Sequence, residues 1–435
     1  MLKIKHNDIS ILDSPIQFRE KIIELIKNAE KRIFITALYI QNDEAGREIL
    51  ELISERKRLV PDLQVEIFVD FHRAQRGLIG DDNQEGNNVL YSKYVSNESS
   101  PLNIYGVPVK IYEAFGVLHM KGYIFDNTLL YTGASLNNVY LHKFDKYRLD
   151  RYFIIDSRPL TDCMCSYLKK YFLSNDSLVK FSNANKTNSK SIKEKIKVFV
   201  KHLRSSTYDS LNYCKGGKGD ICIQPIIGFG KKENHLNNII LELIRKAEVS
   251  LKIYTPYFNM PRTILKELKK AIQRGIKITI IAGDKTANDF YIDPEKPFNK
   301  IGVLPYLYEM NMKKFLDKYH SYIESNMLSI LLWKDGTNSF HLKGVETDEK
   351  YYLFTGHNLN PRAWNLDLEN GLLVSDLNKT MKESLEKEFS FITQNTTKII
   401  HSNEMECLDD YPEQVRRYIK NIRRIKLDLL VKKLL

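Results

Sequence analysis

Two stretches of this chain, EKIIELIKNAEKRIFITALYIQND at residues 20–43 and NNIILELIRKAEVSLKIYTPYFNMP at residues 237–261, follow the same plan. Each predicts a helix with apolar residues at steps of three and four, a short turn at Ala-Glu, and a strand of alternating apolar residues. A further helix and strand follow each copy, ending in LQVEIFVDFHRAQRG (63–77) and IKITIIAGDKTANDF (276–290). A repeat this long indicates a duplicated domain. Helices that alternate with buried strands predict an α/β fold, with mixed sheets layered by helices.

Length and composition agree with two such copies. The chain has 435 residues, 43% of them hydrophobic and 28% charged, which is typical of a globular protein and excludes disordered, collagen-like and disulfide-scaffold classes. No apolar run approaches the ~18 residues of a membrane-spanning helix. The net charge of +12 favours an anionic partner such as nucleic acid, an anionic membrane or a phosphorylated substrate.

Composition shifts along the chain predict its domain organisation. A Ser-, Asn- and Lys-rich stretch over 173–191 reads as a linker, IKEKIKVFVKHL (192–203) has helical spacing, and CKGGKGD (214–220) reads as an exposed turn. We therefore expect an N-terminal half-domain at 1–173, a linker with a connecting helix at 174–220, a C-terminal half-domain at 221–410 and a basic helix at 411–435.

Each half carries the same candidate catalytic segment. His119 and Lys121 precede Asp126, and His341 and Lys343 precede Asp348, in a shared His-x-Lys-x4-Asp pattern. Residues two apart in a strand point to one face. There a lysine neutralises phosphate oxygens while a histidine acts as nucleophile or proton carrier. The two aspartates are candidates for the same site, with a structural turn as the alternative.

An acid follows each segment, namely Asp150 in RLDRYFIID and Glu369 in LDLENGLLVSD. A carboxylate bonded to the second ring nitrogen fixes the tautomer of a catalytic histidine and stabilises its cationic form. A turn that begins with Gly and ends with Asn also follows each segment and supplies candidate phosphate-binding groups. These are Ser135 and Asn137 in GASLN and Asn358 and Asn360 in GHNLN.

The paired segments resemble the two motifs of the phospholipase D superfamily. Longer strings resemble its bacterial phosphatidylserine synthase branch over essentially the whole chain; they include FHRAQRG (71–77), GDKTANDFY (283–291) and NLNPRAWNLDLEN (358–370). The resemblance implies two phospholipase D-like half-domains with one active site at their interface. The superfamily's usual Gly-Ser-x-Asn is altered in both turns, so the group that contacts phosphate stays open.

The resemblance also implies a reaction, the transfer of a phosphatidyl group from CDP-diacylglycerol to L-serine with release of CMP. A phosphatidyl-histidine would form on His119, and His341 would serve as acid and then as base. The lysines would hold the phosphate oxygens together with Asn137 and Asn360, with Asp150 and Glu369 orienting the histidines. Neither a metal nor another cofactor is expected, and the irregularly spaced cysteines lack the paired spacing of a zinc site.

Three basic residues follow the predicted strand that ends at Asp70, where ligand-binding loops of α/β sheets often lie. We expect His72, Arg73 and Arg76 near the cytidine diphosphate or the serine, with structural salt bridges as the alternative.

The last residues carry eight Lys or Arg against one acid after Val415, with an apolar stripe at helical spacing. Such a helix can lie in an anionic membrane interface, or it can pack its stripe on the protein. We expect a cytoplasmic enzyme held peripherally on the inner membrane. The alternatives are a phospholipase D-type phosphodiesterase or nuclease, which the basic surface also suits, and a catalytically inactive binding module.

Overall fold

The N-terminal half forms an eight-stranded mixed sheet. The computed structural model describes residues 1–77, 85–182, 188–209 and 220–424. The strand order is β10-β5-β4-β3-β6-β7-β9-β2, with bounds β10 Val179–Lys180, β5 Asn103–Val107, β4 Gln64–Asp70, β3 Arg32–Ala37, β6 Gly122–Phe125, β7 Thr128–Thr132, β9 Tyr152–Asp156 and β2 Ile9–Leu12. Strands β3, β4 and β5 run parallel, whereas β6, β7 and β9 continue the sheet antiparallel.

The C-terminal half repeats this arrangement in a nine-stranded sheet. Its order is β1-β11-β18-β17-β16-β12-β13-β14-β19, with bounds β1 Leu2–Lys5, β11 Asp220–Phe229, β18 Leu368–Ser375, β17 Tyr351–Thr355, β16 Gly344–Thr347, β12 Ser250–Thr255, β13 Lys277–Gly283, β14 Leu328–Trp333 and β19 Thr396–Ile399. Strands β12, β13 and β14 are parallel and β16, β17 and β18 antiparallel. The six central strands of the two sheets therefore correspond one to one, as the internal repeat predicts.

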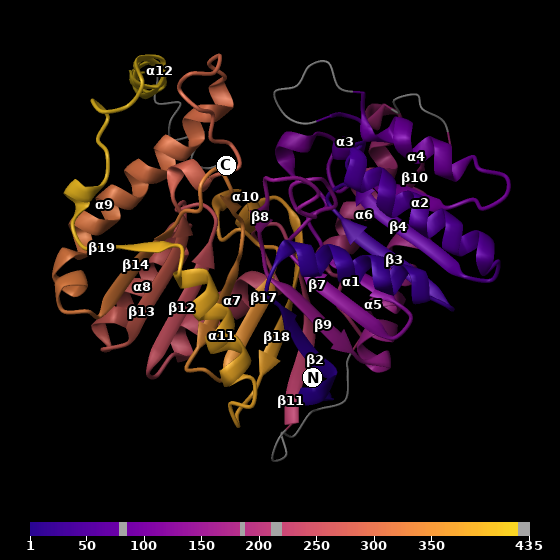
Figure 1. Ribbon diagram of the computed structural model, residues 1–435, viewed down its shortest axis with the longest axis horizontal. Coiled ribbons are helices and arrows are strands. Elements are labelled where there is room, and N and C mark those ends of the chain that lie inside the picture. The colour runs from indigo at the N-terminus through magenta and orange to yellow at the C-terminus, as the bar shows by residue number, and fades with distance from the viewer. Residues whose placement is uncertain (78–84, 183–187, 210–219, 425–435) are drawn as a thin grey trace.

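Helices flank both sheets, so that their apolar stripes meet the strands (Figure 1). In the first half they are α1 Pro15–Asn28, α2 Glu44–Leu59, α3 Phe71–Ala74, α4 Asn87–Val95 and α5 Arg158–Leu168, and α6 Lys193–Arg204 follows. The second half has α7 His235–Lys246, α8 Arg262–Gln273, α9 Leu304–Glu324, α10 Pro361–Asn365 and α11 Lys382–Thr393. The helix expected over 192–203 is α6, and the turn expected at 214–220 lies, except for Asp220, outside the described residues.

One apolar cluster joins the two sheets. Phe34 and Phe153 of the first half and Phe354 and Leu372 of the second belong to the same buried cluster. The rings of Phe153 and Phe354 lie 4.1 Å apart between centroids. Side chains of both sheets thus share one apolar core, which packs the two halves against each other.

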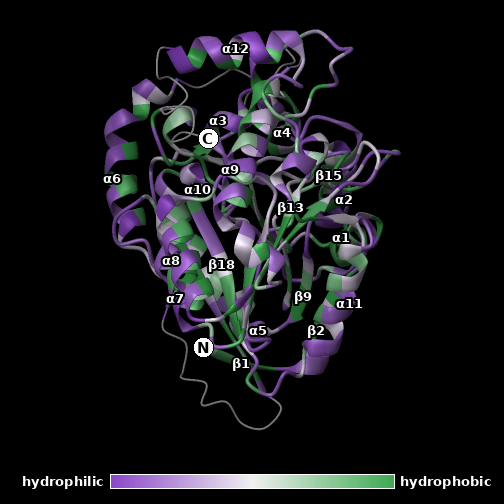
Figure 2. Ribbon diagram, turned by 90° about the vertical axis from the view of Figure 1, so that its left-hand side faces the viewer, coloured by the Kyte–Doolittle hydropathy of each residue, from purple (hydrophilic) through white to green (hydrophobic). Residues whose placement is uncertain are grey.

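The basic tail packs on the protein itself. Within the described residues it forms α12, Glu413–Arg424, which Figure 2 shows lying across one end of the molecule. Its stripe of Val415, Ile419 and Ile422 is buried in a cluster with Tyr306 and Leu307 of α9. Of the two alternatives that the sequence leaves open, packing of the stripe on the protein is therefore the one that holds for the described part of the tail. Residues 425–435 lie outside the described residues. Among the described helices, none has the length and apolar character needed to span a bilayer.

Candidate active site

The two catalytic segments face each other because each is bonded to the other half through its backbone. The His119 N–H donates to the Leu368 carbonyl at 2.9 Å, and the His341 N–H donates to the Leu149 carbonyl at 2.8 Å. The second contact extends a small parallel pair formed by β8 (Arg148–Leu149) and β15 (Ser339–Phe340). Since Leu149 and Leu368 immediately precede the two acids, each backbone bond sets an acid beside the histidine of the opposite half.

The side chains complete these cross-half pairs. His119 Nδ1 lies 2.9 Å from Glu369 Oε2, and His341 Nδ1 lies 3.2 Å from Asp150 Oδ2. All four residues are buried. A carboxylate on Nδ1 directs the other ring nitrogen, Nε2, toward substrate, as in other histidine-dependent transfer enzymes.

The two lysines differ in their surroundings. Lys343 Nζ donates to Asp150 Oδ2 at 3.1 Å and also contacts His341 Nδ1. Lys121 Nζ is buried and has no hydrogen-bond partner within the described residues. An unpaired buried ammonium is costly, so Lys121 is prepared to bind an anion that the protein itself does not supply.

Two glycines make room for this arrangement. A Cβ at Gly133 would lie 2.7 Å from Asp150 Oδ2 and 2.9 Å from Lys343 Nζ. A Cβ at Gly356 would lie 3.1 Å from Lys121 Cγ. The Gly of each turn is thus required by the close approach of the catalytic groups.

Burial and the neighbouring cations hold both histidines neutral. Burial, reinforced by Lys121, lowers the pKa of His119 well below its ordinary value. Burial and Lys343 lower the pKa of His341 to about 4, against the opposing effect of Asp150. Burial also lowers the pKa of Lys121 to about 7.

The two acids are shifted in opposite directions. Burial, with Asp367 nearby, raises the pKa of Glu369 well above its usual range. For Asp150, burial acts to raise the pKa, but Lys343 and His341 outweigh it and the pKa is lowered. Asp150 therefore remains a charged carboxylate, whereas Glu369 is the stronger proton acceptor of the two.

The Asn and Ser groups of the turns lie beside this centre with part of their hydrogen-bonding capacity used. Asn137 Oδ1 accepts from the Tyr140 N–H at 2.8 Å, and Asn360 Oδ1 accepts from the Ala363 N–H at 2.9 Å to begin α10. Ser135 is buried, and Asn358 is half-buried with an Oδ1 that has no partner among the described residues. The side-chain oxygens of Asn137 and Asn360 thus brace the turns.

The catalytic prediction for Asp126 and Asp348 is wrong. Asp126 accepts hydrogen bonds from the backbone N–H groups of residues 30–32, and Asp348 does the same for residues 248–250. Both have positive φ, 52° and 57°, as tight turns favour for Asp. They lie at the far ends of β6 and β16, about 16 Å of extended chain from the lysines. There they hold the starts of β3 and β12.

Of the three basic residues after β4, one lies next to the site. The Arg73 guanidinium stacks over the Tyr39 ring at 4.5 Å, and the Tyr39 hydroxyl accepts from Asn137 Nδ2 at 3.3 Å. His72 Nε2 is bonded to the Lys110 carbonyl, and Arg76 forms a two-point ion pair with Glu113. His72 and Arg76 therefore make structural bonds, which was the alternative to a place near the substrates.

Sequence reasoning missed three residues of the site. The Tyr140 hydroxyl is 2.9 Å from His341 Nδ1, and the Tyr257 ring lies 6.0 Å from the His341 ring. The Asn370 amide bonds both the N–H and the carbonyl of Lys121, each at 2.8 Å. The signal for Asn370 was its place directly after Glu369. No periodicity marks Tyr140 as a neighbour of a histidine in the other half, or Tyr257 as a neighbour of a histidine far along the same half.

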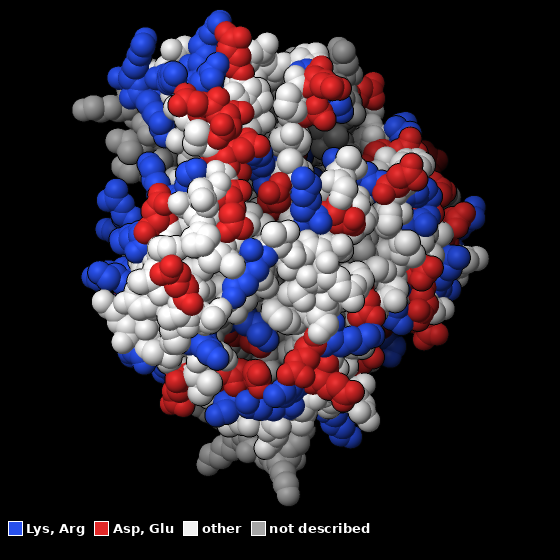
Figure 3. All heavy atoms as spheres, turned by 60° about the vertical axis from the view of Figure 1, so that its left-hand side comes forward, with Lys and Arg blue, Asp and Glu red and all other residues white. Residues whose placement is uncertain are grey.

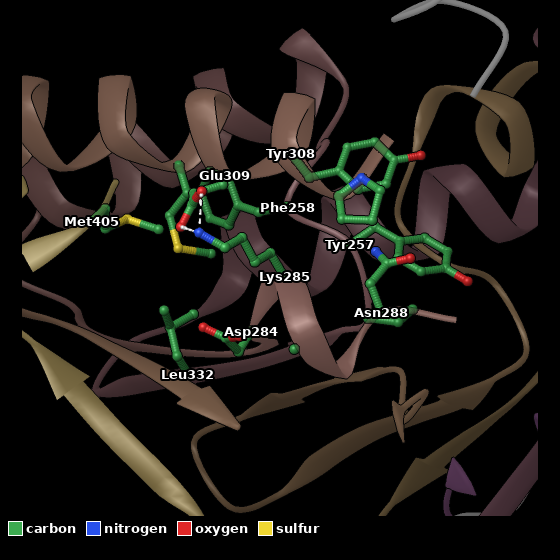
Figure 4. Close-up of a pocket in the computed structure, with 13 residues that line it drawn as sticks. Tyr257, Phe258, Asp284, Lys285, Asn288, Tyr308, Glu309, Leu332 and Met405 are labelled. Atoms are coloured by element: carbon green, nitrogen blue, oxygen red, sulfur yellow. Dashed lines mark hydrogen bonds and ion pairs between the residues drawn. The ribbon is translucent and has the colours of Figure 1, made fainter. Parts of the chain in front are cut away.

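A small hollow lies beside Tyr257 in the second half. Figure 4 shows Tyr257 and Asn288 together at one end, with the Lys285–Glu309 ion pair at the other. It does not include the catalytic histidines. Within the described ranges, no cluster of three or more His, Cys, Asp or Glu side chains is arranged to hold a metal ion.

Two half-domains that contribute one His-Lys pair each to a shared centre define a phosphodiester-processing protein with phospholipase D-like domains. The family model described as "Cardiolipin synthase, PLD-like domain" matches residues 22–172 and 240–392. The chain is 44% identical to the CDP-diacylglycerol–serine O-phosphatidyltransferase of Haemophilus influenzae, covering all of this chain and 96% of that protein. It is 41% identical to the corresponding Escherichia coli enzyme, covering 99% and 95%.

A solved structure agrees with these relatives. The crystal structure of phosphatidylserine synthase from Haemophilus influenzae superimposes with a TM-score of 0.95 at 43% identity, covering 100% of this chain and 97% of that one. The chain therefore belongs to the family of CDP-diacylglycerol–serine O-phosphatidyltransferases. The α/β fold of two phospholipase D-like halves is confirmed.

Proposed function

We propose that this protein transfers the phosphatidyl group of CDP-diacylglycerol to the hydroxyl of L-serine, forming phosphatidylserine and CMP. One observation supports it most directly: each catalytic histidine is bonded through Nδ1 to an acid of the opposite half, as a two-step transfer with one nucleophile and one acid requires. The names of the relatives at 44% and 41% identity support the two substrates.

In the first step His119 Nε2 attacks the lipid-side phosphorus, and the bond from that phosphorus to the CMP oxygen breaks. His341 gives its Nε2 proton to the departing CMP. In the second step the serine hydroxyl oxygen attacks the same phosphorus and its proton passes to His341 Nε2. The phosphorus–nitrogen bond then breaks and His119 is restored.

The difference between the two acids supports these roles. The raised pKa of Glu369 makes it the stronger acceptor of the His119 Nδ1 proton, which raises the electron density on Nε2 of a nucleophile. Without substrate His341 is neutral, because burial lowers its pKa to about 4. The lowered pKa of Asp150 keeps a negative charge beside it, and together with the charge of the bound diphosphate this favours the imidazolium needed for an acid. Lys121 and Lys343 would neutralise the phosphate oxygens in the transition state, an effect often worth several kcal/mol.

The assay for the activity uses purified protein, CDP-diacylglycerol in detergent micelles, and L-serine present or absent. We expect CMP and phosphatidylserine to appear together when serine is present. Hydrolysis of phospholipid or DNA without phosphatidylserine would instead indicate a phospholipase D-type phosphodiesterase or nuclease.

The roles of the histidines are tested with labelled lipid. We expect His341→Ala to accumulate phosphatidyl-protein and His119→Ala to form none. Accumulation in His119→Ala alone would exchange the two roles.

We also propose that the protein works at the cytoplasmic face of the inner membrane, held by the charges of α12 and not by its apolar stripe. Figure 3 shows Lys and Arg side chains gathered at the upper edge of one face, at the end of the molecule where α12 lies. Arg417, Lys420 and Arg424 are exposed on this helix. Each basic group near an anionic bilayer contributes about 1 kcal/mol.

Charge reversal tests this proposal by flotation with vesicles. The triple variant Arg417→Glu, Lys420→Glu and Arg424→Glu reverses the charge of the helix. It should bind phosphatidylglycerol-containing vesicles at least about 100-fold more weakly, whereas binding to phosphatidylcholine vesicles should change little. The matched control places Glu at Lys27, Lys31 and Arg58, which are exposed near the ends of α1 and α2. Equal losses in both variants would show a general charge effect and refute a specific role for α12.

A further inference from the structure

A pair of opposite charges lies beside His341, and no step described above uses it. Arg148 in β8 belongs to the first half, whereas Asp289, just after the short helix at Lys285–Ala287, belongs to the second. Arg148 Nη1 and Asp289 Oδ2 are 3.5 Å apart, and their side chains are 14% and 15% exposed. The pair therefore spans the interface of the half-domains and still reaches solvent.

Two tyrosines connect this pair with the catalytic histidine. The Tyr140 hydroxyl is bonded to His341 Nδ1, and its ring supports the Arg148 guanidinium at 4.8 Å. The Tyr257 hydroxyl donates to Asp289 Oδ1 at 2.5 Å, and its ring lies 6.0 Å from that of His341. One tyrosine side chain thus connects each charge with His341, the acid/base group.

The contact between the two charges is loose. A strong Arg–carboxylate pair is bidentate with bonds near 2.8 Å, whereas the ion-pair distance here is 3.5 Å. The Arg148 Nε donates to the Ser339 hydroxyl at 3.0 Å, which orients the guanidinium without neutralising it. In the loop carrying Asp289, Asn288 accepts the Phe290 N–H at 2.9 Å and borders the hollow of Figure 4. The charges are fixed separately, so that each is available to a ligand.

The position of the pair decides which ligand it meets. In an in-line displacement the acid/base group lies opposite the nucleophile, where CMP leaves and the acceptor alcohol then enters. The acceptor proposed above has a carboxylate and an ammonium on the carbon next to its hydroxymethyl group. A guanidinium fork suits the carboxylate, and a carboxylate suits the ammonium.

We propose that Arg148 and Asp289 select the acceptor, Arg148 by binding the carboxylate of a hydroxy-amino acid and Asp289 by binding its ammonium. This inference rests on the proposed function and assigns the residues that recognise its second substrate. Asp289 also disfavours an acceptor that carries a phosphate in place of the ammonium, because like charges would be brought together.

The test compares acceptors that lack one charged group each. L-Serine, 3-hydroxypropanoate, which lacks the ammonium, and ethanolamine, which lacks the carboxylate, are assayed by acceptor-dependent CMP release. Asp289→Asn should lower the ratio of kcat/KM for L-serine to that for 3-hydroxypropanoate at least about 10-fold. Arg148→Lys should lower the ratio of L-serine to ethanolamine in the same way. A ratio cancels any general loss of activity.

Asp293→Asn is the matched control, since it removes an exposed carboxylate from the same loop and should leave both ratios unchanged. The inference is overturned if neither active-site variant changes its ratio. It is also overturned if a variant loses both the exchange of labelled CMP into CDP-diacylglycerol and its activity with every acceptor. The pair would then serve the first step of the reaction, which does not involve the acceptor. Failure of the proposed function looks different: the unaltered protein would exchange CMP but form no phosphatidylserine.

Discussion

The contrast between Lys121 and Lys343 leads to a prediction about stability. Lys343 Nζ is bonded to Asp150, whereas Lys121 Nζ is buried without a partner among the described residues. Replacing either lysine by Met keeps a similar length and removes the charge. We expect both variants to lose turnover by at least about 100-fold, but to shift the free energy of unfolding in opposite directions.

The size of the effect follows from the pKa of Lys121, which burial lowers from 10.5 to about 7. Lys121 then binds its proton more tightly in the unfolded state than in the folded state. Its protonation therefore lowers the free energy of unfolding, increasingly as pH falls from above 10, and this penalty reaches its full size below about pH 7. At pH 7.5 the penalty is about 4 kcal/mol, and at pH 9.5 it is about 1.4 kcal/mol. Lys121→Met removes it and should stabilise the protein by up to these amounts.

Lys343→Met has the opposite consequence. It leaves the buried Asp150 carboxylate without its lysine partner, and breaking a buried ion pair in this way costs about 3–5 kcal/mol. Urea unfolding followed by the fluorescence of Trp333 and Trp364, both buried, measures the two variants at both pH values. The reasoning is refuted if Lys121→Met destabilises the protein as much as Lys343→Met, or if its gain does not shrink at pH 9.5.

The remaining predictions concern activity and the tail. Because Lys121 loses its charge above a pKa of about 7, kcat/KM for CDP-diacylglycerol should fall as pH rises through that value. In Lys121→Arg, whose side chain stays charged, the remaining activity should fall only above pH 9. If the fall in kcat/KM stays at the same pH in this variant, Lys121 is not the group that causes it. Gly133→Ala places a methyl group 2.7 Å from Asp150 Oδ2 and should lower kcat about 100-fold or more; a wild-type rate in steady-state assays would contradict that close approach. Removal of the residues after Tyr411 uncovers the apolar cluster under Val415, Ile419 and Ile422. Each of these buried side chains contributes about 1.5–3 kcal/mol, so the truncated protein should have a Tm lower by several degrees. An unchanged melting curve would show that α12 does not stabilise the second half.

Local patterns in the sequence were sufficient to predict the duplicated α/β fold and the identity of the His-Lys segments. Strand alternation and helical spacing act over a few residues, and they place β3 and β12 where the two quoted repeats predict. The segments themselves were recognisable because the same His-x-Lys spacing occurs in both halves. Asp126 and Asp348 share that spacing, but a turn stabilised by a side chain and a catalytic carboxylate look alike in sequence.

The apolar stripe of the tail shows a similar ambiguity. Helical spacing of Val415, Ile419 and Ile422 predicts an amphipathic helix equally well for a membrane surface and for a protein surface. Only the presence of Tyr306 and Leu307 beneath the stripe decides between them, because the hydrophobic effect is satisfied by whichever apolar surface is nearest.

The sequence alone determined that this protein has two copies of a phosphate-handling segment, each with a histidine, a lysine and a following acid. The tertiary structure decided how they combine: His119 is bonded to Glu369 and His341 to Asp150, across separations of 250 and 191 residues. It also decided that Lys343 is paired, that Lys121 is not, and that Arg148 lies near Asp289. The reason is physical. Residue type and spacing set the chemistry available to each segment, whereas burial and the approach of a distant partner set its charge, its pKa and its role.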